Sequence, residues 1–266
     1  MFGTRFCLAL GAGALFSMSA AAQELSLTRL DCGNGPNDPR RFSDTFAYTE
    51  STKPFTFSCY VIKHGSDVMV WDTGYLPGSV PNATNKPIVE LLKPINVNPE
   101  QVKFVGISHF HADHTGQLAP FKNATLLIGK GDWDGINANP PMGGANVKGF
   151  AEWISEKRKV EPLTADKDVF GDGSVMVLRA PGHTPGHSML LVRLKEKGPV
   201  VLAGDAVHFH ENYQSEGVPA FNYDRAQTIA SIQRIKQIEK NLKATVIIQH
   251  DPRDIGKLPA FPNAAK

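Results

Sequence analysis

The histidines of this chain are distributed in a way that strongly constrains its fold. Five of the nine lie directly after short apolar runs typical of buried strands, in three groups: His109, His111 and His114, then His183, then His250. Asp205 follows a further apolar run in the same way. Histidines that only fill a core or decorate a surface would be scattered instead. We therefore predict a functional site along the rim where these strand ends and their loops meet.

The order of apolar and turn-forming segments predicts an α/β fold. Short apolar or alternating runs indicate strands at 25–30, 56–63, 67–71, 104–107, 125–128, 175–179, 189–194, 200–203 and 245–248. Helices are expected at 87–92, 150–157 and 224–241, and a further helix is expected to open at 115–117. Strands followed by a helix, and then the same elements again, imply two sheets with helices outside. The expected architecture is an αββα four-layer sandwich.

The spacing His-x-His-x-Asp-His at 109–114 suits a pair of metal ions. Alternate residues of a strand end share one face, so His109 and His111 can reach one ion together. The turn that follows redirects Asp113 and His114 towards a second ion. Of the remaining ligands, His183 would complete the first set, His250 the second, and Asp205 would bridge both ions.

The predicted ligands are imidazoles and carboxylates without a thiolate, a set that suits two zinc ions and also tolerates iron, manganese or cobalt. Two ions ~3.5–4 Å apart serve hydrolysis, because they lower the pKa of a bridging water and stabilise charge on the attacking and leaving oxygens. Three protein ligands and a bridge leave positions open for water and substrate, as catalytic sites require. The pattern therefore predicts attack of a metal-bridging hydroxide on a carbonyl or phosphoryl centre.

The residues of this predicted site, together with Asp72-Thr73-Gly74, resemble the metallo-β-lactamase superfamily over nearly the whole mature chain. Within it, the chain is most similar to the N-acyl-homoserine lactonase (quorum-quenching lactonase) branch. That likeness rests on four segments: 58–60, 211–213, 231–236 and 249–251. The resemblance implies the same ligand assignment, a supporting role for Asp72 and proton transfer by Asp113.

One position departs from the lactonase pattern. The family places a tyrosine three residues after the bridging aspartate, where its hydroxyl helps hold the substrate carbonyl, and this chain has His208 there. An imidazole could donate a similar hydrogen bond, with a pH dependence near neutrality. His208 is thus a candidate catalytic residue beside Asp113, the alternative being a bystander.

The function that the resemblance implies is opening of a lactone, N-acyl-homoserine lactone being the expected substrate. Rivals on the same fold are a β-lactamase and a phosphotriesterase or arylesterase. Iron-based redox chemistry is a further alternative, although the complete second ligand set favours hydrolysis. Candidate pocket walls are Trp133, Met142, Phe150 and Trp153, for which core packing is the competing interpretation.

The remaining histidines with an interpretation are not expected to bind metal. In the segment 182–187, His183 is favoured as the ligand and His187 as a packing or supporting residue. His64 lies in a predicted turn and is expected to be exposed to solvent.

The first 22 residues are typical of a secretory signal peptide: Arg5, an apolar run from 6 to 16, and small residues up to Ala22. We expect cleavage after Ala22, a periplasmic or secreted protein, and a single catalytic domain over 23–266. No segment has the ~20 apolar residues that a membrane span needs, so stable membrane insertion is not expected.

Charge and cysteine content complete the expectations. The formal net charge is +2, and the sequence has no basic stripe with interleaved aromatic residues of the kind that binds nucleic acid. Nucleic acid is therefore not expected as a partner. The expected partner is a small-molecule ester or lactone, and a homodimer is compatible with the sequence. Outside the signal peptide only Cys32 and Cys59 remain. They can pair in an oxidising compartment, or Cys59 can be a buried free thiol.

Overall fold

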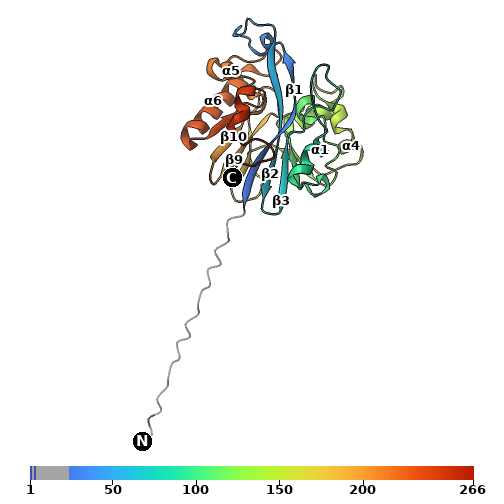
Figure 1. Ribbon diagram of the computed structural model, residues 1–266. Coiled ribbons are helices and arrows are strands. Elements are labelled where there is room, and N and C mark those ends of the chain that lie inside the picture. The colour runs from blue at the N-terminus through green and yellow to red at the C-terminus, as the bar shows by residue number, and fades with distance from the viewer. Residues whose placement is uncertain (2, 4–23) are drawn as a thin grey trace.

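The computed structural model describes residues 1, 3 and 24–266. The apolar run and cleavage site of the predicted signal peptide lie outside these residues. Within the described part, two β-sheets lie against each other, and helices cover the outer side of each sheet (Figure 1). The expected αββα four-layer architecture is confirmed.

The first sheet has six strands, which are adjacent in chain order. They are β1 (Leu25–Asn37), β2 (Lys53–His64), β3 (Asp67–Trp71), β4 (Phe104–Gly106), β5 (Thr125–Gly129) and β6 (Val160–Leu163). The first three strands pair antiparallel, whereas β3 to β6 are parallel neighbours. Parallel neighbours end at the same edge, so the loops after β3, β4 and β5 open onto one rim.

The second sheet has five strands in the order β11-β10-β9-β8-β7. They are β7 (Lys167–Asp168), β8 (Val175–Arg179), β9 (Ser188–Leu194), β10 (Gly198–Leu202) and β11 (Thr245–Ile247). Of these, β10 and β11 run parallel, and the other neighbours pair antiparallel. The carboxyl ends of β10 and β11 therefore lie together.

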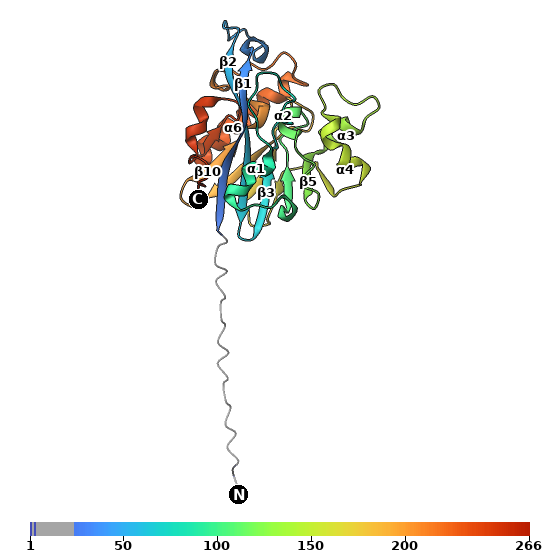
Figure 2. The same ribbon diagram turned by 45° about the vertical axis from the view of Figure 1, so that its right-hand side comes forward.

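Helices flank the two sheets on opposite sides (Figure 2). They are α1 (Ile88–Leu92), α2 (Ala112–Thr115), α3 (Lys130–Asn137), α4 (Ala151–Ser155), α5 (His210–Ser215) and α6 (Arg225–Leu242). Short 3₁₀ helices occur at η1 (Pro39–Phe42), η2 (Lys93–Ile95), η3 (Pro99–Gln101), η4 (Val147–Phe150), η5 (Gly204–Ala206) and η6 (Pro252–Lys257). In the described part of the chain, no helix is long and apolar enough to cross a bilayer.

The core is layered because strand side chains alternate between the two faces of a sheet. On β3, Met69 and Trp71 pack between the sheets, whereas Val70 packs on the opposite face, in the cluster that contains α1 and α4. On β9, Leu190 lies between the sheets, and Leu191 packs in the cluster that contains α6. Each sheet is therefore apolar on both faces, and polar residues concentrate at the strand ends.

The prediction that a helix begins at 115–117 is wrong. The short helix α2 instead ends at Thr115, whose hydroxyl donates a hydrogen bond to the His111 carbonyl at 2.7 Å. Immediately afterwards, Gly116 lies so close to the backbone of Gly74 and Leu76 that a Cβ atom there would overlap it. This close approach ends the helix and fixes the chain beside the rim.

His64 is not the exposed turn residue expected from the sequence. It ends β2, its residue is only 7% exposed, and its ring stacks on Phe170 with 4.3 Å between ring centroids. Its Nε2 atom lies 2.7 Å from Asp172 Oδ2. The adjacent turn between β2 and β3 is Gly65-Ser66, so the turn itself was placed correctly while the side chain folds back onto the second sheet.

The two cysteines form a disulfide, Cys32–Cys59, between β1 and β2. The alternative of a buried free thiol at Cys59 does not hold. The bond lies beside the Asp72-Thr73-Gly74 segment, because a Cβ atom on Gly74 would be 2.9 Å from Cys32 Cβ. It thus fastens two neighbouring strands beneath the rim.

Candidate metal centre

The predicted ligands converge at the rim because each follows the end of a strand. His109, His111, Asp113 and His114 come from the loop and helix after β4, and His183 comes from the loop between β8 and β9. Asp205 lies on η5 after β10, and His250 follows β11. The site therefore lies at the junction of the two sheets.

The first cluster consists of His109, His111, His183 and Asp205, whose ligand atoms lie within 4.8 Å of one another. His111 Nδ1 lies 2.8 Å from His109 Nε2 and 3.1 Å from His183 Nε2. The Oδ2 atom of Asp205 lies 3.4 Å from His183 Nε2. Three imidazole nitrogens and a carboxylate oxygen thus surround one point.

The second cluster consists of Asp113, His114, Asp205 and His250. Here Asp205 uses its other oxygen: Oδ1 lies 2.8 Å from His250 Nε2 and 3.2 Å from His114 Nε2. Asp113 Oδ2 lies 3.5 Å from His114 Nε2. Asp205 therefore belongs to both clusters, with one carboxylate oxygen facing each.

Contacts on the far side of the rings orient several of these imidazoles. His250 Nδ1 donates to the Thr56 carbonyl at 2.7 Å, and His183 Nδ1 lies 2.8 Å from Asn222 Oδ1. His114 Nδ1 lies 2.9 Å from Asp72 Oδ2, and Asp72 Oδ1 accepts the Ser108 amide at 2.7 Å. A hydrogen bond at Nδ1 fixes the ring and leaves Nε2 available to an ion. Asp72 thus lies where the resemblance placed it.

Burial and charge make the clusters suitable for a cation. Burial lowers the pKa of His109 and His183 well below the usual range, so both rings are neutral with free lone pairs. Burial would raise the pKa of Asp205, but the imidazoles of His250 and His114 hold it well below the usual range.

The pKa of His114 behaves differently from those of its neighbours. Burial would lower it, but the carboxylates of Asp205, Asp113 and Asp72 raise it well above the usual range. Asp205 Oδ1 is buried and accepts no hydrogen bond from the described residues. A buried carboxylate that also faces the neutral rings of His109 and His183 offers the ligand atoms that a divalent cation such as zinc prefers.

His187 and His208 lie beside the clusters in different ways. His187 uses both ring nitrogens: Nδ1 donates to the Ala180 carbonyl at 2.9 Å, and Nε2 accepts the Asp205 amide at 2.9 Å. Burial lowers its pKa to about 4, consistent with an accepting neutral ring. His187 therefore supports Asp205 rather than facing an ion. His208 is buried, with Nε2 3.1 Å from Asp205 Oδ2 and no hydrogen-bond partner at Nδ1 among the described residues.

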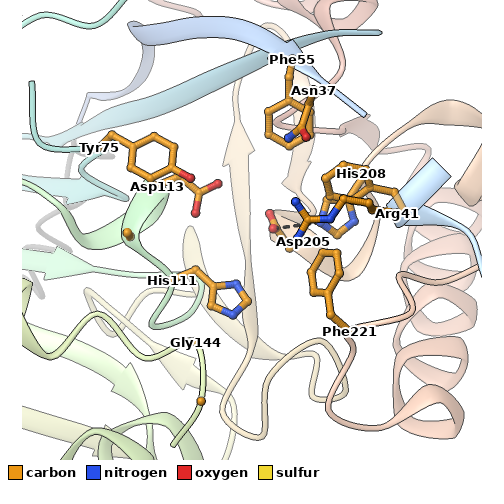
Figure 3. Close-up of a pocket in the computed structure, with 13 residues that line it drawn as sticks. Asn37, Arg41, Phe55, Tyr75, His111, Asp113, Gly144, Asp205, His208 and Phe221 are labelled. Atoms are coloured by element: carbon orange, nitrogen blue, oxygen red, sulfur yellow. Dashed lines mark ion pairs between the residues drawn. The ribbon is translucent and has the colours of Figure 1, made fainter. Parts of the chain in front are cut away.

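A cavity of about 480 Å³ opens above the clusters. Figure 3 shows Tyr75 and Asp113 on one side and Arg41, His208 and Phe221 on the other. The Arg41 guanidinium lies over the Phe221 ring at 5.5 Å from its centroid. The lining residues are Asn37, Arg41, Phe42, Phe55, Tyr75, His111, Ala112, Asp113, Gly143, Gly144, Asp205, His208 and Phe221.

The candidate pocket walls from the sequence do not line this cavity, and the competing interpretation of core packing is the one observed. Phe150 and Trp153 are buried in the core under the helices, and Trp133 and Met142 pack against that core. From the loop that carries Met142, only the two glycines reach the cavity. Other cavity residues were not predicted from the sequence: Arg41 on η1, Tyr75 directly after the Asp72-Thr73-Gly74 segment, and Phe221 in a turn. No local pattern marks any of the three as facing the site.

Comparison with known proteins identifies the family. Residues 53–250 match the metallo-beta-lactamase superfamily. The chain therefore belongs to this superfamily, as its histidine pattern indicated.

The curated relatives include lactonases, the branch expected from the sequence. The chain is 32% identical over 167 residues to the N-acyl homoserine lactonase AttM of Rhizobium radiobacter, covering 62% of this chain. That match spans 64% of AttM, just under two thirds of its length. A Bacillus sp N-acyl homoserine lactonase is 28% identical over 210 residues, covering 73% of this chain and 80% of the relative.

Solved structures share the fold. A quorum-quenching N-acyl homoserine lactone hydrolase superposes with a TM-score of 0.78 at 23% identity, covering 92% of this chain and 99% of the other. AidC, described as a dizinc quorum-quenching lactonase in complex with a product, has a TM-score of 0.70 at 18% identity, covering 92% and 90%. At this identity the likeness concerns the fold alone.

Proposed function

We propose that this protein is a metal-dependent hydrolase that opens a lactone ring, with N-acyl-homoserine lactone as its substrate. The observation that carries the proposal is the pair of ligand clusters joined through the two oxygens of Asp205 below an open cavity. The similarity to N-acyl homoserine lactonases supports the choice of a lactone over a β-lactam or a phosphotriester.

The residues fit two divalent ions, for which we propose zinc from the donor set. His109, His111 and His183 would hold one ion, Asp113, His114 and His250 the other, and Asp205 both. When bound, the ions would polarise the substrate carbonyl and lower the pKa of a water molecule between them.

Side chains that line the cavity would carry out the remaining steps. Asp113 directs Oδ2 towards His114 and His250, which leaves Oδ1 to accept a proton and pass it to the departing ring oxygen. The Tyr75 hydroxyl and the Arg41 guanidinium can donate to substrate oxygens from opposite sides. His208 Nε2 can donate a hydrogen bond either to Asp205 Oδ2 or to the substrate carbonyl oxygen.

The test is a substrate panel with zinc-loaded protein: an N-acyl-homoserine lactone, a chromogenic β-lactam and a phosphotriester. We expect acid release from the lactone, and the His250→Ala variant should lower kcat/KM on the order of 100-fold or more. His64→Ala is the matched control, because it truncates another buried histidine. His64 ends β2, whereas His250 contacts Thr56 near the start of that strand, so this variant should retain activity. Turnover of the β-lactam or phosphotriester with none of the lactone would sink the proposal.

We also propose that the protein is exported to the periplasm or beyond. The composition of residues 1–22 supports this, and the Cys32–Cys59 disulfide is the kind of bond that persists in an oxidising compartment. Amino-terminal sequencing of the protein recovered from the cell envelope fraction should begin at Gln23. A chain that retains Met1 in the cytoplasmic fraction would contradict export.

A further inference from the structure

Asp132 is a fully buried aspartate that belongs to neither ligand cluster and does not line the cavity. It lies in the first turn of α3, directly after β5. Its carboxylate accepts three hydrogen bonds. Oδ2 accepts from the Phe110 amide at 3.0 Å and from the Thr184 hydroxyl at 2.8 Å, and Oδ1 accepts from the Gly186 amide at 2.6 Å.

These three donors belong to the two loops that supply the histidines of the first ligand cluster. Phe110 lies between His109 and His111, and Thr184 directly follows His183. His111 and His183 are 72 residues apart in the chain. One carboxylate thus connects both loops. Its donors are immediate neighbours of His109, His111 and His183, whereas Asp113 and His114 lie on α2, which follows, and none of its hydrogen bonds goes to the segment that carries His250.

The surrounding backbone leaves little freedom for this carboxylate to move. A Cβ atom on Gly129 would overlap the Gly186 carbonyl oxygen, and a Cβ atom on Gly131 would lie 2.8 Å from Pro185. The start of α3 therefore lies directly against the loop after His183. Because the packing around the Asp132 carboxylate is this tight, neither a larger side chain nor movement of the neighbouring backbone could replace a lost hydrogen bond.

The position is unfavourable for a carboxylate that only contributes to packing. Burial raises the pKa of Asp132 to about 7, against the effect of its three donors, and no cationic side chain contributes to its stabilisation. A buried carboxylate without a counter-ion costs stability unless its hydrogen bonds are all made. The geometry therefore assigns Asp132 a task beyond filling space.

We propose that Asp132 is a positioning residue for one ion only: it holds the His109–His111 loop against the His183 loop and so sets the affinity of the cluster formed by these three histidines. The inference rests on the proposed two-ion centre. It distinguishes the two clusters, because the second is oriented by other contacts, such as those of Asp72 and Thr56.

The experiment measures zinc affinity of the purified full chain by competition with a chromophoric chelator. In Asp132→Asn the new amide nitrogen cannot accept, so at least one N–H donor loses its partner. We expect one of the two bound ions to be held on the order of 10- to 100-fold more weakly, and the other ion as in wild type. In cobalt-loaded protein, the absorption bands of only one of the two ions should change.

Two further variants separate positioning from general stability. Asp168→Asn removes a similar acceptor, since Asp168 accepts the Gly171 and Gly173 amides at 2.9 and 2.8 Å in the turn between β7 and β8. It should lower the unfolding midpoint and leave both ions unaffected. Thr184→Val removes one of the three donors to Asp132 and should weaken binding of the same ion by a smaller factor. It provides the test if Asp132→Asn fails to fold.

Equal weakening of both ions in step with a fall in the unfolding midpoint would overturn the proposal, as would wild-type affinity for both ions in Asp132→Asn and Thr184→Val. If the wild-type protein hydrolyses the lactone, either of these variant results would leave the proposed function intact. A wild-type protein that binds no divalent ion would overturn both.

Discussion

At the scale of single residues, the segment next to His250 is held by one arginine. Arg253 donates to Asp251 Oδ1 at 2.8 Å from Nε, and to both oxygens of Glu211 at 2.9 and 2.8 Å. Asp251 directly follows His250, and Glu211 lies on α5. This pairing connects α5 to the loop that carries the last proposed ligand, and Lys53 lies 3.3 Å from Glu211 on the same side.

This arrangement predicts a pH dependence of stability. The hydrogen bonds from Arg253 lower the pKa of Glu211 to about 2, from a usual value of 4.5. A lowered pKa in the folded state means that the stabilisation is present above about pH 4.5 and is lost as the pH falls towards 2. For this partly exposed pair we expect about 0.5–1 kcal/mol at neutral pH.

The measurement is urea unfolding of metal-free wild type and Glu211→Gln between pH 7 and pH 2. Wild type should be the more stable protein at pH 7, and its advantage should disappear across the acid range. An advantage that stays constant down to pH 2, or its absence at pH 7, would show that the pair does not act in this way.

At the scale of elements, the sequence predicted best where apolar alternation is strong. The bounds expected for β3 and β8 are the observed ones, because both strands pack apolar residues on each face. The unpredicted strand β6 is short, contains Pro162 and lies at the edge of its sheet, where proline is tolerated. Helix α3 was missed because Gly131 and Gly135 weaken its helical pattern.

The candidate site shows the same division between local and tertiary information. The ligand clusters could be predicted because each histidine follows a strand end, a feature that is local in sequence. The cavity walls could not, since Arg41, Tyr75 and Phe221 reach the site only through the packing of segments that are far apart in the chain. His64 was misplaced for the same reason: its partners Phe170 and Asp172 lie in the turn between β7 and β8 of the other sheet, more than 100 residues away.

At the scale of the whole molecule, the proposed metal centre joins the two halves of the sandwich. The segment 109–114 follows β4 of the first sheet, whereas His183, Asp205 and His250 follow strands of the second. The complete donor set therefore exists only when the sheets are packed together. An ion that binds this folded arrangement and not the unfolded chain stabilises the fold by mass action.

The most direct measurement is a zinc titration of chelator-treated, metal-free protein that follows both bound metal per chain and acid release from an N-acyl-homoserine lactone. We predict that two zinc ions bind per chain, that hydrolysis is absent without metal, and that the rate reaches its maximum only as the second ion binds. Full activity of the metal-free protein, or a maximal rate with a single ion bound per chain, would contradict the account.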